Sequence, residues 1–190
     1  MEKLSGYDEA QAITGEYEKL EAGGYICKII NAKEEQSKSG KKMLVLAIDI
    51  AEGEHKDFYK KRYDEATKNA SPDKPAKWSG IYRQMLEGEK AVGFLKGVMT
   101  SLEASNNGFK WEWDEKKLIG LKFGGIFGEE EYEKTDGSIG TTTKIKFIRT
   151  VKAIQDGNYK IPELKKLPVK GDSFEEFAKA ADENDDDLPF

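Results

Sequence analysis

Alternating apolar and polar side chains predict several strands along this chain. Gly23-Gly24 precedes an apolar, β-branched run at 25–30, and strict alternation at 43–50 places four aliphatic side chains on one face. Aromatic and basic residues then alternate at 58–63. These three segments predict a meander of three strands, followed by a long connection over 64–88.

The next pattern has a helical period. Apolar residues at 91–102 recur at three- and four-residue spacing, which predicts an amphipathic helix. Two more alternating segments, 121–132 and 141–153, are joined by a loop that contains Asp136-Gly137, a pair typical of a hairpin turn. The chain is thus expected to end its ordered part with two further strands.

The predicted order is three strands, a long loop, a helix and two strands. It matches an OB-fold-like five-stranded Greek-key barrel, an all-β fold with one helix between strands three and four. An SH3-like barrel or a β-sandwich fragment lacks a helix at that place. We therefore expect an N-terminal arm at 1–22, the barrel at 23–153, a Pro- and Lys-containing linker at 154–171 and an acidic tail at 172–190.

The charge of the chain is divided unevenly. The net charge is −5, but residues 172–190 hold eight acids and a single base, Lys179, for a net charge of −7. That leaves +2 on residues 1–171. A weakly basic body with an acidic tail points to nucleic acid or to self-regulation, although chaperones and proteins under selection for solubility also carry acidic tails.

Candidate enzyme chemistry is sparse. Cys27 is the only cysteine and His55 the only histidine, so no disulfide can form within the chain and the common zinc sites cannot be assembled. Any Ser-His-Asp or Cys-His mechanism would depend on that one histidine. We expect no metal, no cofactor and no enzymatic activity.

The hydropathy pattern gives no membrane signal. No apolar run reaches the roughly 18 residues that cross a bilayer, and the polar N-terminus does not resemble a signal peptide. The sequence predicts a cytoplasmic protein without a membrane partner.

Cations and aromatic rings gather where an OB barrel binds extended ligands, namely strands two and three and the loops beside them. Cations suit phosphates, and flat rings stack on bases. The tyrosines of 58–63 could instead cap the core, Trp78 could fasten its loop to the body, and the basic residues of the last strand could form a plain solvated face. The candidate nucleic-acid-binding residues are Lys38, Lys41, Lys42, Tyr59, Lys60, Lys61, Arg62, Tyr63, Trp78, Tyr82, Arg83, Lys144, Lys146 and Arg149.

The C-terminus carries the most specific pattern. An acidic run is expected to stay outside any core, and here it ends on two apolar side chains. Such a tip can insert its ring into a partner's pocket while a basic rim holds the carboxylates. A plain solubility tail is the alternative. The candidate partner-binding residues are Asp185, Asp186, Asp187, Leu188, Pro189 and Phe190.

This ending resembles the acidic tip Asp-Asp-Asp-Ile-Pro-Phe of bacterial single-stranded DNA-binding proteins, with Leu188 in place of Ile. Residues 22–25, 37–41 and 105–111 are similar to phage-encoded relatives of that family. The resemblance implies single-stranded DNA binding in replication, recombination and repair in a bacterial host cell. It also implies that the tip recruits partner enzymes, and it is compatible with a homo-oligomer.

Two other functions fit parts of the sequence. A protein-interaction adaptor would use the same barrel as a partner groove without DNA affinity. A nuclease would use some of the 36 acids with a divalent metal, although no spacing among them indicates such a site.

Overall fold

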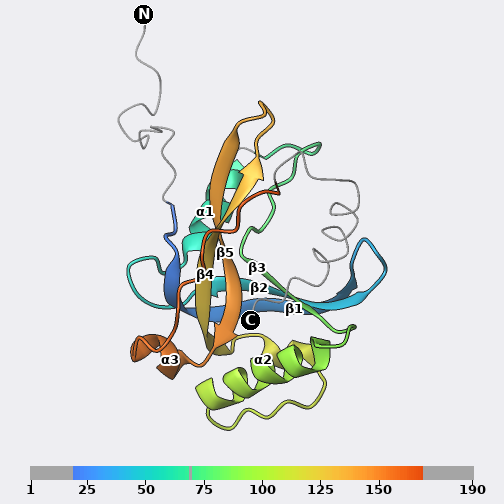
Figure 1. Cartoon of the computed structure of the whole chain (residues 1–190), viewed down its shortest axis with the longest axis vertical. Coiled ribbons are helices and arrows are strands. Elements are labelled where there is room, and N and C mark those ends of the chain that lie inside the picture. Colours follow the sequence, from blue (N-terminus) through green and yellow to red (C-terminus); the bar gives the residue numbers. More distant parts are fainter. Residues whose placement is uncertain (1–18, 69, 169–190) are drawn as a thin grey trace, which may run out of the picture.

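The computed structural model describes residues 19–68 and 70–168. These residues form a mostly β structure with five strands and three α-helices (Figure 1). The elements in chain order are β1 (Gly23–Gln36), β2 (Lys42–Ile50), α1 (Phe58–Lys68), β3 (Ile81–Met85), α2 (Ala91–Ser105), the 3-10 helix η1 (Glu115–Leu118), β4 (Lys122–Glu133), β5 (Ile139–Arg149) and α3 (Val151–Gln155).

The five strands form one antiparallel sheet in the order β3-β2-β1-β4-β5. β1 is the central strand: Cys27 lies opposite Ile50 of β2 on one side and opposite Phe123 of β4 on the other. The two edge strands, β3 and β5, also contact each other, so the sheet curls back on itself. The predicted number of strands and the helix between the third and fourth are confirmed, but the described residues form three α-helices where one was expected.

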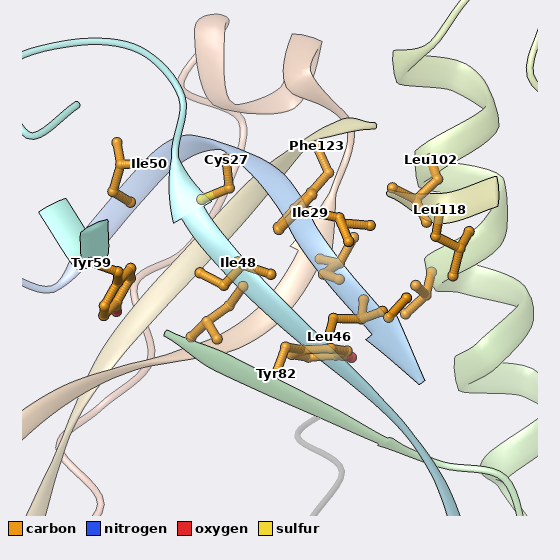
Figure 2. Close-up of a cluster of buried hydrophobic side chains, with 14 of the residues drawn as sticks. Cys27, Ile29, Leu46, Ile48, Ile50, Tyr59, Tyr82, Leu102, Leu118 and Phe123 are labelled. Carbon is orange, nitrogen blue, oxygen red and sulfur yellow. The ribbon is translucent and has the colours of Figure 1, made fainter. Parts of the chain in front are cut away.

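The core fills the inside of this curled sheet. Alternation within β2 points Leu44, Leu46, Ile48 and Ile50 inward, and all four are buried. Figure 2 shows Leu46 and Ile48 facing Tyr82 of β3 and Ile29 of β1, with Cys27 and Phe123 beyond them. Leu102 of α2 and Leu118 of η1 close one end of the cluster. The remaining buried members include Phe127, Ile145 and Ile148.

The predicted strand at 58–63 is wrong: this segment begins the helix α1. Asp57 adopts a left-handed φ of 59°, which turns the chain out of the preceding loop. The buried carboxylate of Asp49 then accepts the backbone N–H groups of Tyr59 and Lys60 in the first helical turn. Arg62 lies 5.5 Å from the ring centroid of Phe58, one helical turn away. Tertiary capping and burial thus override the β propensity of these aromatic residues.

The third strand lies instead at Ile81–Met85, inside the segment predicted as a long connection. It pairs with β2 through Leu46 opposite Tyr82 and Leu44 opposite Gln84. Gln84 is fully buried although it is polar, because its side chain accepts the Tyr82 hydroxyl and donates to the Met85 carbonyl. Because Gln84 occupies an inward position, the alternation of apolar and polar residues that marks a strand cannot be recognised in this segment of the sequence.

The helix α2 covers one end of the sheet and contacts β3, β4 and β5 (Figure 1). Asn106 fastens its C-terminal end, because this side chain donates to the Lys122 carbonyl at 2.7 Å and accepts the Lys122 N–H at 2.9 Å. The predicted helix at 91–102 is confirmed. Among the helices described, none is long and apolar enough to cross a membrane.

The chain does not leave the sheet after β5, contrary to the predicted strand to 153 and linker from 154. Thr150 caps α3 by accepting the Ala153 N–H. Residues 150–167, here called the strap, then run along β4, where the backbone of Lys165 bonds to those of Glu129 and Glu131. Glycine makes this approach possible: a Cβ on Gly124 would lie 2.5 Å from the Thr150 carbonyl oxygen.

Candidate nucleic-acid interface

A cavity of about 360 Å³ opens between the edge strands β3 and β5. Each strand bonds to a sheet neighbour on one side only, β3 to β2 and β5 to β4, and the other side of each faces the cavity. The helix α2 forms its third wall and the strap adds Lys165. The lining residues are Ile81, Tyr82, Arg83, Gln84, Gly93, Phe94, Gly97, Val98, Glu130, Lys144, Ile145, Lys146, Phe147, Ile148, Arg149 and Lys165.

Cations dominate the ionisable groups of this lining. Five of them converge from three segments that are far apart in sequence, against a single carboxylate, Glu130. Cations held around one concave site raise the local concentration of anionic ligands. The five cations are Arg83 from β3, Lys144, Lys146 and Arg149 from β5, and Lys165 from the strap.

A β-bulge determines which side chains β5 presents. The register between β4 and β5 shifts at Ile126 and Phe127, so that Phe127 pairs with Ile145 and Ile126 with Phe147. Ile145 and Ile148 are therefore both buried, three residues apart, and Phe147 turns to the partly exposed side together with the basic residues. Simple alternation places Phe147 on the same face as Ile145.

Arg149 joins the two edges of the cavity. Its guanidinium carbon lies 5.3 Å from the ring centroid of Phe147, a cation–π contact. It also acts across the cavity on Tyr82 of β3: burial raises the pKa of this phenol to about 12, and the Arg149 charge opposes that rise. The phenol therefore stays neutral at physiological pH, and it donates its hydrogen bond to Gln84 at 3.1 Å.

Glu130 forms ion pairs with two of the five cations. Its carboxylate pairs with Lys146 at 2.6 Å and with Lys144 through its other oxygen. Partial burial raises the pKa of Glu130, but the hydrogen bonds and charges of the two lysines outweigh this effect and hold the pKa below its ordinary value. The carboxylate is therefore ionised at neutral pH.

Two glycines of α2 leave the helix backbone open to the cavity. Gly93 and Gly97 are exposed, one helical turn apart, and a Cβ built on either would meet nothing within 4 Å. Glycine inside a helix costs about 1 kcal/mol relative to alanine. No close packing in the described residues accounts for that cost at these two positions.

Five of the predicted nucleic-acid-binding residues line the cavity: Tyr82, Arg83, Lys144, Lys146 and Arg149. More than 60 positions separate the two members on β3 from the three on β5. Their proximity therefore cannot be seen in the sequence, and it follows from the contact between β3 and β5. Phe94, Phe147, Glu130 and Lys165 were not among the candidates. The helical period of 91–102 was visible, but it did not reveal that Phe94 points to an opening instead of the core.

The candidate residues at 59–63 do not form the ligand-binding face of a third strand, because α1 replaces that strand. Tyr59 is buried, and burial raises the pKa of its phenol. Tyr63 is partly exposed and packs against Trp78, with ring centroids 5.6 Å apart. Lys60 pairs with Asp64 on the helix surface, and Arg62 covers Phe58. None of these residues lines the cavity.

Trp78 fastens the connection between α1 and β3 to the body. Its indole N–H donates to the Ile48 carbonyl at 3.1 Å, and its ring packs against the core. Lys38, Lys41 and Lys42 lie in and beside the turn between β1 and β2, where Lys42 pairs with Glu34. This hairpin projects from the body of the sheet (Figure 1). Neither Trp78 nor these lysines line the cavity.

The candidate partner-binding residues at 185–190 lie outside the described residues. Within 19–68 and 70–168, no group of three or more His, Cys, Asp or Glu side chains is arranged to hold a metal ion.

The chain was also compared with known proteins. One family model matches residues 6–107, which is 102 of the 190 positions and reaches from before β1 to just past α2. The matched region includes β3 and α2, two of the walls of the cavity, whereas β5 and the strap lie beyond it. No curated protein matches the sequence. The chain belongs to the family described as protein of unknown function (DUF669).

Proposed function

We propose that this protein binds single-stranded DNA without sequence preference, through the cavity between β3 and β5. The observation that carries the proposal is the convergence of five cations and two phenylalanines on one concave site. Single strands are bound by cations along the backbone and by rings that stack on bases, each stacked base being worth about 1–3 kcal/mol.

The size and composition of the cavity support this class of ligand. About 360 Å³ is near the lower end of the roughly 300–1,000 Å³ that small-molecule sites occupy. A site of this size suits one nucleotide unit of a strand and is too small for a base-paired duplex. Phe94 and Phe147 supply apolar surface for a base, and the cations at the rim suit its flanking phosphates.

We further propose that the architecture is an OB-type barrel. The strand order, the helix between β3 and β4, and the contact between β3 and β5 all agree with that fold. OB barrels often bind oligonucleotides. With the acidic C-terminal tip, this supports a role beside replication, recombination and repair enzymes, with Asp185–Asp187 and Leu188–Phe190 as the docking segment.

The experiment is a titration of a labelled oligo-dT and of a duplex of equal length, followed by anisotropy. We expect tight binding of the single strand only, weakening as salt rises. Arg149→Gln should weaken this binding about tenfold, since it removes a cation and its contact with Phe147. The matched control is Lys61→Gln, which removes one exposed charge on α1 away from the cavity. Equal losses in both variants would contradict binding at the cavity.

One observation favours a second function. Because each edge strand leaves one side unpaired toward the cavity, an extended peptide could add to β3 or β5 through backbone hydrogen bonds. The protein would then be an interaction adaptor. Absence of oligonucleotide binding at low salt, together with salt-independent binding of a peptide, would favour this function over the first.

A further inference from the structure

Glu130 is the one acidic side chain among the residues that line the cavity. It projects from β4 toward β5, and it pairs with Lys146 at 2.6 Å and with Lys144 through its second oxygen. Two of the five cations of the site thus already share one carboxylate of the protein itself.

The pair between Glu130 and Lys146 differs from an ordinary surface pair. The side chains of Glu130 and Lys146 are only 19% and 18% exposed, so water screens their interaction less than it screens a fully exposed pair. Glu129, the preceding residue on β4, does not line the cavity. Of these two neighbouring acids on β4, Glu130 alone places its negative charge in the cavity.

We propose that Glu130 is a built-in counter-ion, which a bound phosphodiester must displace before Lys144 and Lys146 can bind its phosphates. This role rests on the proposed function and deepens it. In the empty site, Lys144 and Lys146 then share the single negative charge of Glu130, which lowers the net positive charge of the site by one, so that it binds isolated small anions more weakly. A strand that carries several phosphates can make enough contacts at once to exchange both ion pairs.

The salt dependence of binding gives this idea a specific signature. Each phosphate that a cation neutralises releases counterions from a single strand, which steepens the decline of affinity with salt by about 0.7 per contact. In the wild type, the displaced Glu130 carboxylate binds a cation from solution in place of the lysines. This cation uptake offsets part of the counterion release from the DNA. Removing its charge should therefore steepen the dependence by about one unit.

The test compares wild-type protein, Glu130→Gln and Glu129→Gln as full chains, with labelled oligo-dT anisotropy over a series of salt concentrations. We expect Glu130→Gln to bind roughly tenfold tighter at low salt, with the steeper slope. Glu129→Gln removes the same net charge one residue away, so its slope should stay that of the wild type. Thermal unfolding of each variant confirms that it is folded.

Two single substitutions in the wild type keep the test decisive if Glu130→Gln is poorly folded. Lys144→Gln should reduce the slope less than Arg83→Gln does, because Lys144 already pairs with Glu130. Unchanged or weaker binding by a folded Glu130→Gln would overturn the counter-ion role, and weaker binding would show that Glu130 contacts the ligand directly. Failure of wild type and variants alike to bind DNA would overturn the proposed function, and this role with it.

Discussion

The carboxylate of Asp49, near the end of β2, accepts the backbone N–H of Tyr59, the second residue of α1, at 2.9 Å. It also accepts the N–H of Ile50 at 2.9 Å and that of Lys60 at 3.3 Å. A strand residue thereby satisfies the donors at the start of a helix that follows it by nearly ten positions. The contact orients α1 and buries Phe58 and Tyr59 against the sheet.

Asp49→Ala should destabilise the protein by about 2–3 kcal/mol, because it leaves buried N–H donors unpaired and removes a helix cap. Asp49→Asn keeps one acceptor oxygen and should cost about 1 kcal/mol. Urea unfolding of both variants measures the difference. Equal stability of Asp49→Ala and wild type would show that water satisfies these donors.

The same carboxylate should affect the pH dependence of stability. Burial raises the pKa of Asp49 above its ordinary 3.8, in spite of the backbone hydrogen bonds. The folded chain then binds this proton more tightly than the unfolded chain, so the contribution of Asp49 to the free energy of unfolding falls as pH rises from 3.8 through the raised pKa. The stability difference between wild type and Asp49→Asn, followed from about pH 3 to about pH 7, should show that fall. A difference that grows with pH would contradict it.

Gly97→Ala should stabilise the fold and weaken DNA binding. Alanine raises helix propensity by about 1 kcal/mol, and its Cβ meets no protein atom within 4 Å. The same methyl group projects into the proposed site. Thr100→Ala, also on the exposed surface of α2 but outside the cavity lining, is the control that should leave affinity unchanged. Thermal unfolding and oligo-dT titration separate the two effects, and a stabilised variant with wild-type affinity would exclude contact with the helix backbone.

Gly124→Ala should be strongly destabilising, by about 2 kcal/mol or more. Its Cβ would lie 2.5 Å from the Thr150 carbonyl oxygen and 2.5 Å from the Ile154 side chain, so the strap must shift. Gly128→Ala should cost less. The atoms nearest to its added Cβ belong to the Pro162 ring and lie 3.2 Å away, so a smaller shift relieves the contact. The ranking of the two variants by urea unfolding checks how firmly the strap is packed, and a reversed ranking would contradict this packing.

Deleting residues 182–190 should tighten oligo-dT binding at low salt and abolish recruitment of partner enzymes. The deleted segment holds five of the 36 acids, and it competes with DNA for the cations if it reaches them. The gain should vanish at moderate salt, where both polyanions are screened. Replacing Asp185–Asp187 by asparagine keeps the length and should reproduce part of the gain. Unchanged affinity at low salt would count against the competition.

The sequence predicted those strands whose inward residues are uniformly apolar. The alternation of β2 and the hairpin of β4 and β5 could be seen because neighbouring residues in the chain carry the signal. The helix α1 could not, since its cap, Asp49, belongs to another element and its aromatic residues favour strands. The strand β3 was hidden by Gln84, whose burial depends on a hydrogen bond from Tyr82.

The candidate site was predictable in part for a related reason. The cations Arg83, Lys144 and Arg149 stand out as residue types, but only the contact between β3 and β5 brings them together. Simple alternation puts Phe147 on the wrong face, because a bulge on one strand cannot be inferred without its partner. Lys165 was assigned to a linker because the glycines that let the strap approach β4 have no local signature.

The position of the strap limits how far the C-terminal residues can reach from the cavity. It passes the cavity at Lys165, and residues 169–190 begin just beyond it. At roughly 3.5 Å per residue, even a fully extended chain from there to Phe190 spans on the order of 75 Å. A protein bound to residues 185–190 is then held within that radius of the cavity, at an effective concentration on the order of 1 mM. Under the proposed function, the encounter of this bound partner with a DNA strand in the cavity becomes intramolecular, so that it no longer depends on the partner's concentration in the cell.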